Sequence, residues 1–331
     1  MDTFNKLGAN SDTSARRQSV AVLVPCYNEE TTIELVVQQF RKALPEATIY
    51  VYDNNSADRT TARAQAAGAI VRRERLQGKG NVVRRMLADI DADIYVMVDG
   101  DATYDADAAP AMVEMLISEN LDMVNGTRVT EIAEAYRPGH RLGNVVLTWL
   151  VRATFGTGIA DMLSGYKVLS RRFVKSMPLL STGFEIETEL AVHALSLRMP
   201  LGEMPTTYRD RPVGSESKLN TYRDGIRILK TIVILIKEER PLSFFGWMAG
   251  FLVLVSLGFA APVIATYLES GLVPRLPTAV LSAAIMLLAF LSMTCGLILD
   301  TVTRGRKENK RMAYLAAGAP RQHQESLAAR R

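Results

Sequence analysis

The 331-residue sequence has few cysteines and no dense block of positive charge, and each absence argues against a class of protein. Cys26 and Cys295 are its two cysteines, too few and too far apart for a disulfide framework or a zinc cluster. The net charge of +4 is mild and no Lys/Arg block alternates with aromatic residues, which argues against a nucleic-acid partner. No G-x-G-x-x-G follows the first expected strand, so a Rossmann dehydrogenase is not indicated.

Charge is also missing from two long stretches near the C-terminus. Residues 244–267 and 277–299 are uncharged, and each exceeds the roughly 20 apolar residues that a helix needs to cross a bilayer. The alternative is a buried hairpin of a soluble protein, although buried helices usually carry a polar stripe. Lys and Arg gather outside both stretches, whereas the connecting loop has Arg275 as its one cation. The positive-inside tendency predicts a multi-pass protein of the inner (cytoplasmic) membrane, with both flanks in the cytoplasm.

These patterns divide the chain into segments. We expect a disordered lead over 1–18, which lacks the apolar region of a secretory signal, and a cytosolic α/β domain over 19–220. An amphipathic juxtamembrane helix is expected over 221–241, two transmembrane helices over 242–302 and a basic cytosolic tail over 303–331.

Two segments have the mixed apolar and basic composition of interfacial helices. They are residues 144–159 and residues 221–240. In the second segment Ile226, Leu229 and Val233 fall on one face, with Ile236 extending it and basic residues elsewhere. A basic amphipathic helix beside a membrane span fits an in-plane anchor on anionic lipids, and the alternative is a helix packed on the sheet.

Short apolar runs alternate with helical patterns through the first 130 residues. The runs at 20–24, 48–52, 69–72, 94–98 and 123–124 are typical of buried strands, with helices expected between them. This alternation predicts a mostly parallel sheet flanked by helices. Polar residues follow several strands directly, at the edge where open α/β sheets bind their ligands.

Acidic clusters follow three of these strands and form the candidate site. Glu29 follows the first strand, DNNSAD at 53–58 follows the second, and Asp99 and Asp101 follow the fourth. Carboxylates on separate loops of one sheet edge can converge. Asp99 and Asp101 offer hard oxygen ligands suited to Mg²⁺ or Mn²⁺ holding a diphosphate. The DNNSAD turn is open to two interpretations, a helix cap or a grip on a base or ribose.

The order of these motifs resembles a known family. VPCYNE, DNNSAD, GKG and DGD are followed by GTR at 126–128, DMLSGYKV at 161–168, GFEIETEL at 183–190 and YRDRPVGSESKL at 208–219. The series resembles the inverting family 2 glycosyltransferases with the GT-A fold, and within them the polyprenyl-phosphate branch that includes dolichyl-phosphate mannose synthase. The resemblance implies transfer of one sugar from a UDP- or GDP-sugar to a polyprenyl phosphate, with inversion, at the cytosolic membrane face. The two C-terminal spans match bacterial members of the branch.

The resemblance also implies roles for single residues. Donor nucleotide binding is expected of Pro25, Tyr27, Glu29, Asp53, Asn55, Lys79, Asp99 and Gly100. Asp99 and Asp101 would hold the divalent metal, Mg²⁺ or Mn²⁺. Phosphate or acceptor binding is expected of Arg128, Arg209, Arg211, Ser217 and Lys218, and of His140 among its neighbouring arginines. Homo-oligomers occur in this branch, so a tetramer is an open expectation, as is contact with membrane lipids.

Asp161 and Asp101 are the candidate catalytic residues. The family pattern places Asp161 near the acceptor, where it is a candidate base. The expected acceptor is a phosphate monoester with a second pKa of about 6, so near neutral pH it needs little deprotonation. We therefore expect Asp161 to orient the acceptor or the metal–sugar complex more than to remove a proton.

Three residues keep a structural alternative. Glu185 and Glu187 precede an apolar helix, and one of them could serve only as its cap. His193 lies within that helix and is expected to be structural.

Two other functions remain as alternatives: a processive polysaccharide synthase, which usually has a Q-x-x-R-W motif and more spans, and a catalytically silent membrane scaffold.

Overall fold

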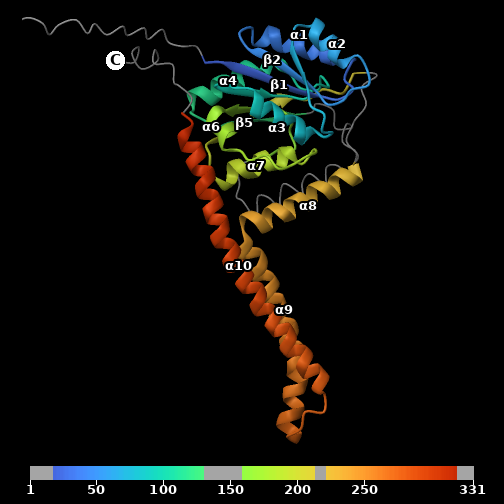
Figure 1. The fold of residues 1–331 in the computed structure, drawn as a ribbon, viewed down its shortest axis with the longest axis vertical. Coiled ribbons are helices and arrows are strands. Elements are labelled where there is room, and N and C mark those ends of the chain that lie inside the picture. Colours follow the sequence, from blue (N-terminus) through green and yellow to red (C-terminus); the bar gives the residue numbers. More distant parts are fainter. Residues whose placement is uncertain (1–17, 130–158, 213–220, 319–331) are drawn as a thin grey trace, which may run out of the picture.

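The computed structural model describes residues 18–129, 159–212 and 221–318, which form an α/β domain with a long helical hairpin extending from it (Figure 1). The domain contains a seven-stranded sheet in the order β3-β2-β1-β4-β6-β5-β7. β6 runs antiparallel to β4 and β5, and the other pairs are parallel. The strands are β1 (Val20–Cys26), β2 (Thr48–Asp53), β3 (Ile70–Arg73), β4 (Ile94–Met97), β5 (Met123–Val129), β6 (Lys167–Ser170) and β7 (Leu201–Thr207). The five strands expected from the apolar runs are all present.

Helices cover both faces of this sheet, as the unbroken apolar strands predict. Side chains alternate along β1, so that Leu23 packs in one apolar cluster and Val22 and Val24 pack in the other. The first cluster includes residues of α3, α6 and α7, and the second includes residues of α1 and α4. The helices are α1 (Ile33–Ala43), α2 (Thr60–Ala66), α3 (Lys79–Asp89), the 3₁₀ turn η1 (Ala106–Ala108), α4 (Ala109–Ser118), α6 (Arg171–Ser176) and α7 (Ile186–Ser196).

The parallel strands β1, β2 and β4 bring the motif loops to one edge. In the register of the sheet Cys26 lies beside Asp53, and Leu23 lies beside Met97. The loops after β1, β2 and β4 therefore leave the sheet side by side. This alignment collects the first loop, the DNNSAD turn and DGD although they are far apart in sequence.

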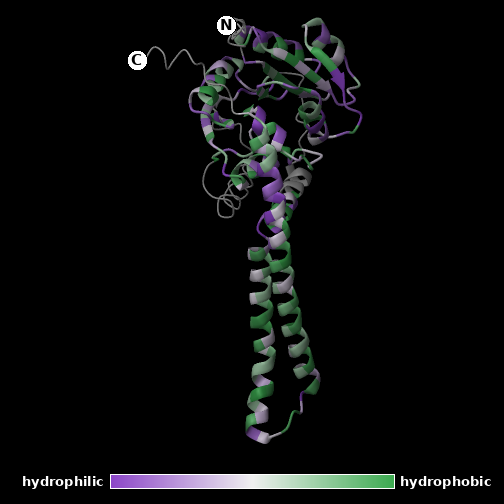
Figure 2. Cartoon of the chain, turned by 60° about the vertical axis from the view of Figure 1, so that its left-hand side comes forward, coloured by the Kyte–Doolittle hydropathy of each residue, from purple (hydrophilic) through white to green (hydrophobic). Residues whose placement is uncertain are grey.

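The hairpin consists of α9 (Pro241–Ser270) and α10 (Leu276–Ala316), and α8 (Thr221–Glu239) leads into it along the underside of the domain (Figure 1). Figure 2 shows the length of the hairpin as predominantly hydrophobic. The most apolar window of each helix has a mean hydropathy of 2.2, and 17% of the first window and 22% of the second are buried within the protein. Helices of a soluble core would be mostly buried, so the two helices suit a membrane and not a soluble hairpin.

Small residues at seven-residue spacing hold α9 against α10. Ala249 and Ser256 are buried on α9, and Ser282 and Ala289 are buried on α10. Ser256 Oγ donates to the Ser282 carbonyl at 2.8 Å, and Ser282 Oγ donates to the Ser256 carbonyl at 3.0 Å. Small side chains allow apolar helices to approach closely where no hydrophobic effect drives them together. The large apolar side chains are consequently left on the outer faces.

α10 continues beyond its apolar part and reaches the domain (Figure 1). Its 41 residues correspond to about 60 Å at 1.5 Å per residue, roughly twice the thickness of a hydrocarbon core. The basic tail expected over 303–331 is therefore helical as far as Ala316. Lys307 and Lys310 on this extension donate to the backbone carbonyl and the carboxylate of Glu239, at 3.0 and 2.9 Å, and so cap the carbonyl end of α8.

The end of α10 is fixed to the sheet through a buried carboxylate. Tyr314 donates a 2.8 Å hydrogen bond to Asp122, which lies directly before β5 and is fully buried. Ser170 Oγ donates to the same carboxylate at 2.7 Å, and Arg172 pairs with it. The Arg172 guanidinium also lies 5.0 Å from the centre of the Tyr314 ring. The apolar hairpin and the sheet are thus joined by a specific polar contact as well as by chain connectivity.

Replacing Tyr314 by Phe removes one hydrogen bond to this buried carboxylate. We expect a loss of about 1.5–3 kcal/mol of stability, the range for hydrogen bonds to charged groups, seen as a lower melting temperature of the detergent-solubilised protein. The matched control is Tyr267→Phe, which makes the same change on the exposed side of α9. Equal melting temperatures for Y314F and Y267F would show that the contact does not hold α10 to the domain.

Candidate active site

The first loop, residues 27–30, and the DNNSAD turn are joined by hydrogen bonds from backbone N–H groups to side-chain oxygens. The backbone N–H of Asn28 donates to Ser56 Oγ at 2.9 Å, and Asn28 Oδ1 accepts the N–H of Ala57 at 2.8 Å. Asp58 accepts the N–H groups of Glu30 and Thr60 at 3.2 and 3.0 Å. Part of the DNNSAD motif is therefore structural, since its polar side chains fix the shape of these two loops.

The two asparagines of the same turn are committed to the loop that leads to α3. The side chain of Asn54 donates to the carbonyls of Glu74 and Leu76, at 3.0 and 2.8 Å, and accepts the N–H of Gly78 at 2.7 Å. Asn55 donates to the carbonyl of Arg75 at 2.8 Å. Asn55 thus supports the loop through this bond, and its expected role in nucleotide binding stays a prediction. Asp53 is buried at the end of β2, where its carboxylate accepts the N–H of Ser56.

The two glycines of GKG let another loop pass against the start of α3. A Cβ at Gly78 would lie 2.1 Å from the carbonyl oxygen of Thr182, and one at Gly80 would lie 2.3 Å from that of Ser181. Gly78 also has φ of +127°, which side-chain-bearing residues rarely adopt. The close approach places Lys79 between DGD and the segment that begins α7.

Lys79 connects two carboxylates at the centre of the site. Its Nζ lies 2.5 Å from Asp99 Oδ1 and 2.5 Å from Glu187 Oε1. Burial opposes the charge on Lys79, but Asp99 and Glu187 outweigh burial and raise its pKa above the ordinary value. Burial raises the pKa of Glu187, against the attraction of Lys79. Lys79 is therefore a buried member of the site and not an exposed loop lysine, and Glu187 belongs to the site as its partner.

Asp101 has both carboxylate oxygens engaged. Thr103 donates its hydroxyl to Oδ1 at 2.6 Å, and the Arg211 guanidinium lies 2.6 Å from Oδ2. Burial raises the pKa of Asp101 and nearby Asp99 raises it further, while Arg211 lowers it. Arg209, on the same segment, pairs more loosely with Asp105 at 3.4 Å. The segment that follows β7 thus lies over the DGD loop.

Arg128 and Asp161 form a two-point ion pair beside this loop. The guanidinium donates from Nε to Asp161 Oδ2 at 2.7 Å and from Nη2 to Oδ1 at 2.8 Å. Burial favours the neutral carboxyl, but the hydrogen bonds and charge of Arg128 outweigh burial and lower the pKa of Asp161. The Arg128 guanidinium also lies 5.6 Å from the centre of the Tyr208 ring. Asp161 is consequently held in one orientation as a weak base.

Lys167 is a buried residue behind the site that the motif analysis did not single out. Its Nζ lies 2.5 Å from Asn125 Oδ1, and the Asn125 side-chain amide donates to the backbone carbonyl of Asp161 at 2.8 Å. Burial lowers the pKa of Lys167 to about 8, although Asp161 and Glu187 oppose this change. A lysine in the apolar alternation of DMLSGYKV was the available signal. Lys167 acts on the site through Asn125 and so supports the position of Asp161.

The donor set fits a divalent cation that is shared with a diphosphate. Within residues 18–129, 159–212 and 221–318, no group of three or more His, Cys, Asp or Glu side chains is arranged to hold an ion. Mg²⁺ is usually bound by one or two carboxylates and completed by water and substrate phosphates. Asp99 and Asp101 supply two such carboxylates, so the remaining ligands of a bound metal would come from water and from the diphosphate of a nucleotide-sugar.

The structure places the remaining predicted residues as follows. Pro25 is buried next to the last residue of β1, Tyr27 is partly exposed, and Glu29 is buried with Thr32 Oγ1 3.2 Å from its carboxylate. A Cβ at Gly100 would lie 2.6 Å from the Cys26 sulfur, so close packing explains this glycine. The predictions that His140, Ser217 and Lys218 bind phosphate or acceptor concern residues outside the described ranges.

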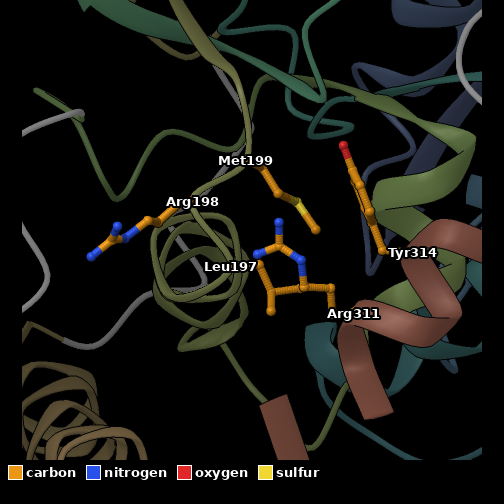
Figure 3. A pocket seen from close by; sticks show the side chains of 5 residues that line it. All are labelled: Leu197, Arg198, Met199, Arg311 and Tyr314. Atoms are coloured by element: carbon orange, nitrogen blue, oxygen red, sulfur yellow. The ribbon is translucent and has the colours of Figure 1, made fainter. Parts of the chain in front are cut away.

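Two other features do not belong to the site. His193 is buried in α7, where its Nε2 lies 3.1 Å from Ser176 Oγ and burial lowers its pKa to about 3, as suits a neutral structural histidine. A pocket of about 60 Å³ lies between the turn after α7 and the end of α10, and it is lined by Leu197, Arg198, Met199, Arg311 and Tyr314 (Figure 3). Ligand pockets usually exceed about 300 Å³, so this pocket is too small for a nucleotide.

Comparisons with known proteins agree with this geometry. Residues 21–177 match the family described as glycosyl transferase family 2. Glycosyltransferase AglJ of Haloferax volcanii is 36% identical over 249 residues, which cover 73% of this chain and 77% of AglJ. A dolichyl-phosphate hexose transferase of the same organism is 29% identical over 222 residues, which cover 67% of this chain and 95% of that protein. The chain therefore belongs to glycosyltransferase family 2.

Solved structures show the same fold. Glucosyl-3-phosphoglycerate synthase of Mycobacterium tuberculosis superimposes with a TM-score of 0.54 at 22% identity, over 68% of this chain and 81% of that protein. Its complex with Mn²⁺ and UDP-glucose gives a TM-score of 0.54 at 24% identity, over 65% of this chain and 79% of that protein. The α/β domain is thus a GT-A fold.

The lowered pKa of Lys167 predicts a pH dependence of stability. Between about pH 8 and 10.5 the unfolded chain binds a proton at Lys167 that the folded protein does not, so this residue makes stability rise with pH in that window. The slope is at most about 1.4 kcal/mol per pH unit. Lys167→Met should remove this contribution, measured as a flatter dependence of melting temperature on pH than in the wild type.

Lys175→Met is the matched control, because Lys175 pairs with Asp91 at the surface. We expect its pH dependence to follow that of the wild type. A K167M curve parallel to the wild-type curve would mean that Lys167 is fully charged in the folded protein.

Proposed function

We propose that the protein transfers a single sugar from a nucleotide-sugar to a polyprenyl phosphate at the membrane surface, with inversion of the anomeric centre. The observation that carries the proposal is the continuity of α10. One helix belongs to the apolar hairpin and also contacts, through Asp122, the sheet that presents Arg128, the partner of Asp161. The site is in this way attached at a fixed distance from a bilayer, where a lipid phosphate would lie.

The shape of α8 supports an acceptor at headgroup level. Ile226, Leu229 and Val233 are 69%, 45% and 43% exposed, whereas Ile232 is fully buried. Ile236 packs against the core instead of continuing the exposed face. α8 therefore combines both expected roles, since one face packs on the domain and another offers apolar side chains to a membrane interface.

The cations at the base of the hairpin favour a cytoplasmic site. Arg304, Arg306, Lys307, Lys310 and Arg311 lie on α10 beyond its apolar part, next to the domain. The opposite end of the hairpin carries Arg275 in its short connection. By the positive-inside tendency, the domain and the extension of α10 lie on the cytoplasmic side of a bacterial-type inner membrane.

The relatives and neighbours support the substrate classes. One relative is named a dolichyl-phosphate hexose transferase, and one structural neighbour was solved with Mn²⁺ and UDP-glucose. Asp99 and Asp101 would hold a metal that offsets the charge developing on the leaving diphosphate. Lys79, Arg128 and Arg211 surround the same loop and can bind phosphate oxygens.

Asp161 is suited to positioning the acceptor in this reaction. A phosphate oxygen attacks the anomeric carbon and the nucleoside diphosphate leaves, so no strong base is needed when the phosphate is already a dianion. The two-point pair with Arg128 lowers the pKa of Asp161 and fixes the guanidinium beside the DGD loop. Arg128 can then meet the acceptor phosphate in a defined orientation.

Asp161→Asn should reduce kcat by about 10²-fold, near the low end of the range for a general base, without changing the shape of the pH–rate profile. Steady-state transfer measured across the pH range tests this expectation. A loss near 10⁴-fold with a changed pH profile would assign proton removal to Asp161.

The activity is tested by nucleoside diphosphate release from detergent-purified full-length protein with Mg²⁺ or Mn²⁺, undecaprenyl phosphate and a panel of UDP- and GDP-sugars. We expect lipid-dependent release from one donor and a loss of at least about 10²-fold in Asp101→Asn, because this carboxylate would hold the metal that offsets the charge on the leaving diphosphate. Asp91→Asn is the control, since Asp91 is a surface carboxylate paired with Arg171. Release that no lipid stimulates for any donor would refute the proposal and favour a silent scaffold or a different acceptor.

A further inference from the structure

The acidic residues expected to bind metal are already neutralised by cations of the chain itself. Lys79 Nζ lies 2.5 Å from Asp99 Oδ1, and the Arg211 guanidinium lies 2.6 Å from Asp101 Oδ2. The second oxygen of Asp101 accepts from Thr103. A divalent cation that approaches DGD therefore meets oxygens that are already bonded, and it meets two positive charges as well.

We propose that Lys79 and Arg211 are resident counter-ions that exchange partners when the donor binds. They release Asp99 and Asp101 to the metal and pass to the oxygens of the donor diphosphate. The inference rests on the proposed function, because it takes a metal and a nucleotide as the ligands of this site. It goes beyond that function by predicting that neither ligand binds well without the other.

Charge balance requires the two halves of the exchange to occur together. Metal binding alone would bring a divalent cation against the positive charges of Lys79 and Arg211, and like charges this close repel each other. Diphosphate binding alone would bring negative charge against the carboxylates. When both ligands arrive, the metal takes the carboxylates and the diphosphate takes the cations, so each charge keeps a partner.

Glu187 is the anchor that keeps Lys79 in the site during this exchange. It is buried at the start of α7, and its Oε1 lies 2.5 Å from Lys79 Nζ. Lys79 can give up Asp99 while retaining Glu187. The glycines on either side, packed against residues 181 and 182, keep the backbone of Lys79 in place, so that only the side chain has to turn.

The experiment measures equilibrium binding of Mn²⁺ and of UDP, each with and without the other, to full-length protein in detergent. GDP is measured in parallel. For the wild type we expect UDP to tighten Mn²⁺ binding by on the order of 5- to 150-fold, and linkage requires Mn²⁺ to tighten UDP binding by the same factor. Free Mn²⁺ is read from its electron paramagnetic resonance signal, so the readout does not depend on turnover.

The variants are Arg211→Gln and the double variant Lys79→Gln/Glu187→Gln, which removes a buried cation and its anchor together. In both, Mn²⁺ alone should bind at least about fivefold more tightly than to the wild type, and UDP alone should bind more weakly. The factor by which UDP tightens Mn²⁺ binding should fall correspondingly. Lys175→Gln, which removes a surface lysine paired with Asp91, should leave all constants unchanged.

A fixed cation would give a different result. If Lys79 and Arg211 keep their places in the loaded site, the variants tighten Mn²⁺ binding equally with and without UDP, and the unchanged coupling factor overturns the exchange. If the wild type binds neither UDP nor GDP in the presence of Mn²⁺, the proposed function itself fails. The two failures are therefore distinguished by whether the wild type forms the ternary complex.

Discussion

The ion pairs of Lys79 with Asp99 and Glu187 are the interaction on which the arrangement of the site depends. Asp99 follows β4, Lys79 begins α3 and Glu187 lies in the first turn of α7, so one ammonium group joins three elements. The close approach of residues 181–182 to the GKG glycines brings these groups together. Carboxylates gathered at one sheet edge repel each other, and the ammonium group of Lys79 offsets this repulsion.

The second constraint comes from the proposed function, in which a water-soluble donor and a membrane-held acceptor must meet at one place. The sheet provides the site for the donor, because its parallel strands end at a common edge and bring the motif loops together there. α10 would bring this site to the acceptor, because it extends from the apolar hairpin to the buried Asp122 before β5. Arg128 lies at the other end of the same strand. The apolar hairpin and the cation that is proposed to bind phosphate are thus connected by a single strand, β5.

Much of the fold could be predicted from the sequence, since apolar runs and the order of the motifs can be read directly from the chain. The apolar runs predicted strands β1 to β5 and both apolar helices, and the motifs predicted which loops the sheet brings to one edge. The sequence could not show that Asn54 and Asn55 hold the loop before α3, because that depends on the register between β2 and β3. The participation of Glu187 and Lys167 was also beyond it, since both act through partners that only the fold brings near.

The central claim is that the site acts on a phosphate in the bilayer that holds its own hairpin. It is tested with protein reconstituted in vesicles, a labelled donor outside, and undecaprenyl phosphate placed either in the protein-bearing vesicles or in separate protein-free vesicles. The account predicts labelled lipid only when acceptor and protein share a bilayer. Equal labelling of lipid in protein-free vesicles would contradict it, because the site would then reach its acceptor without the anchor.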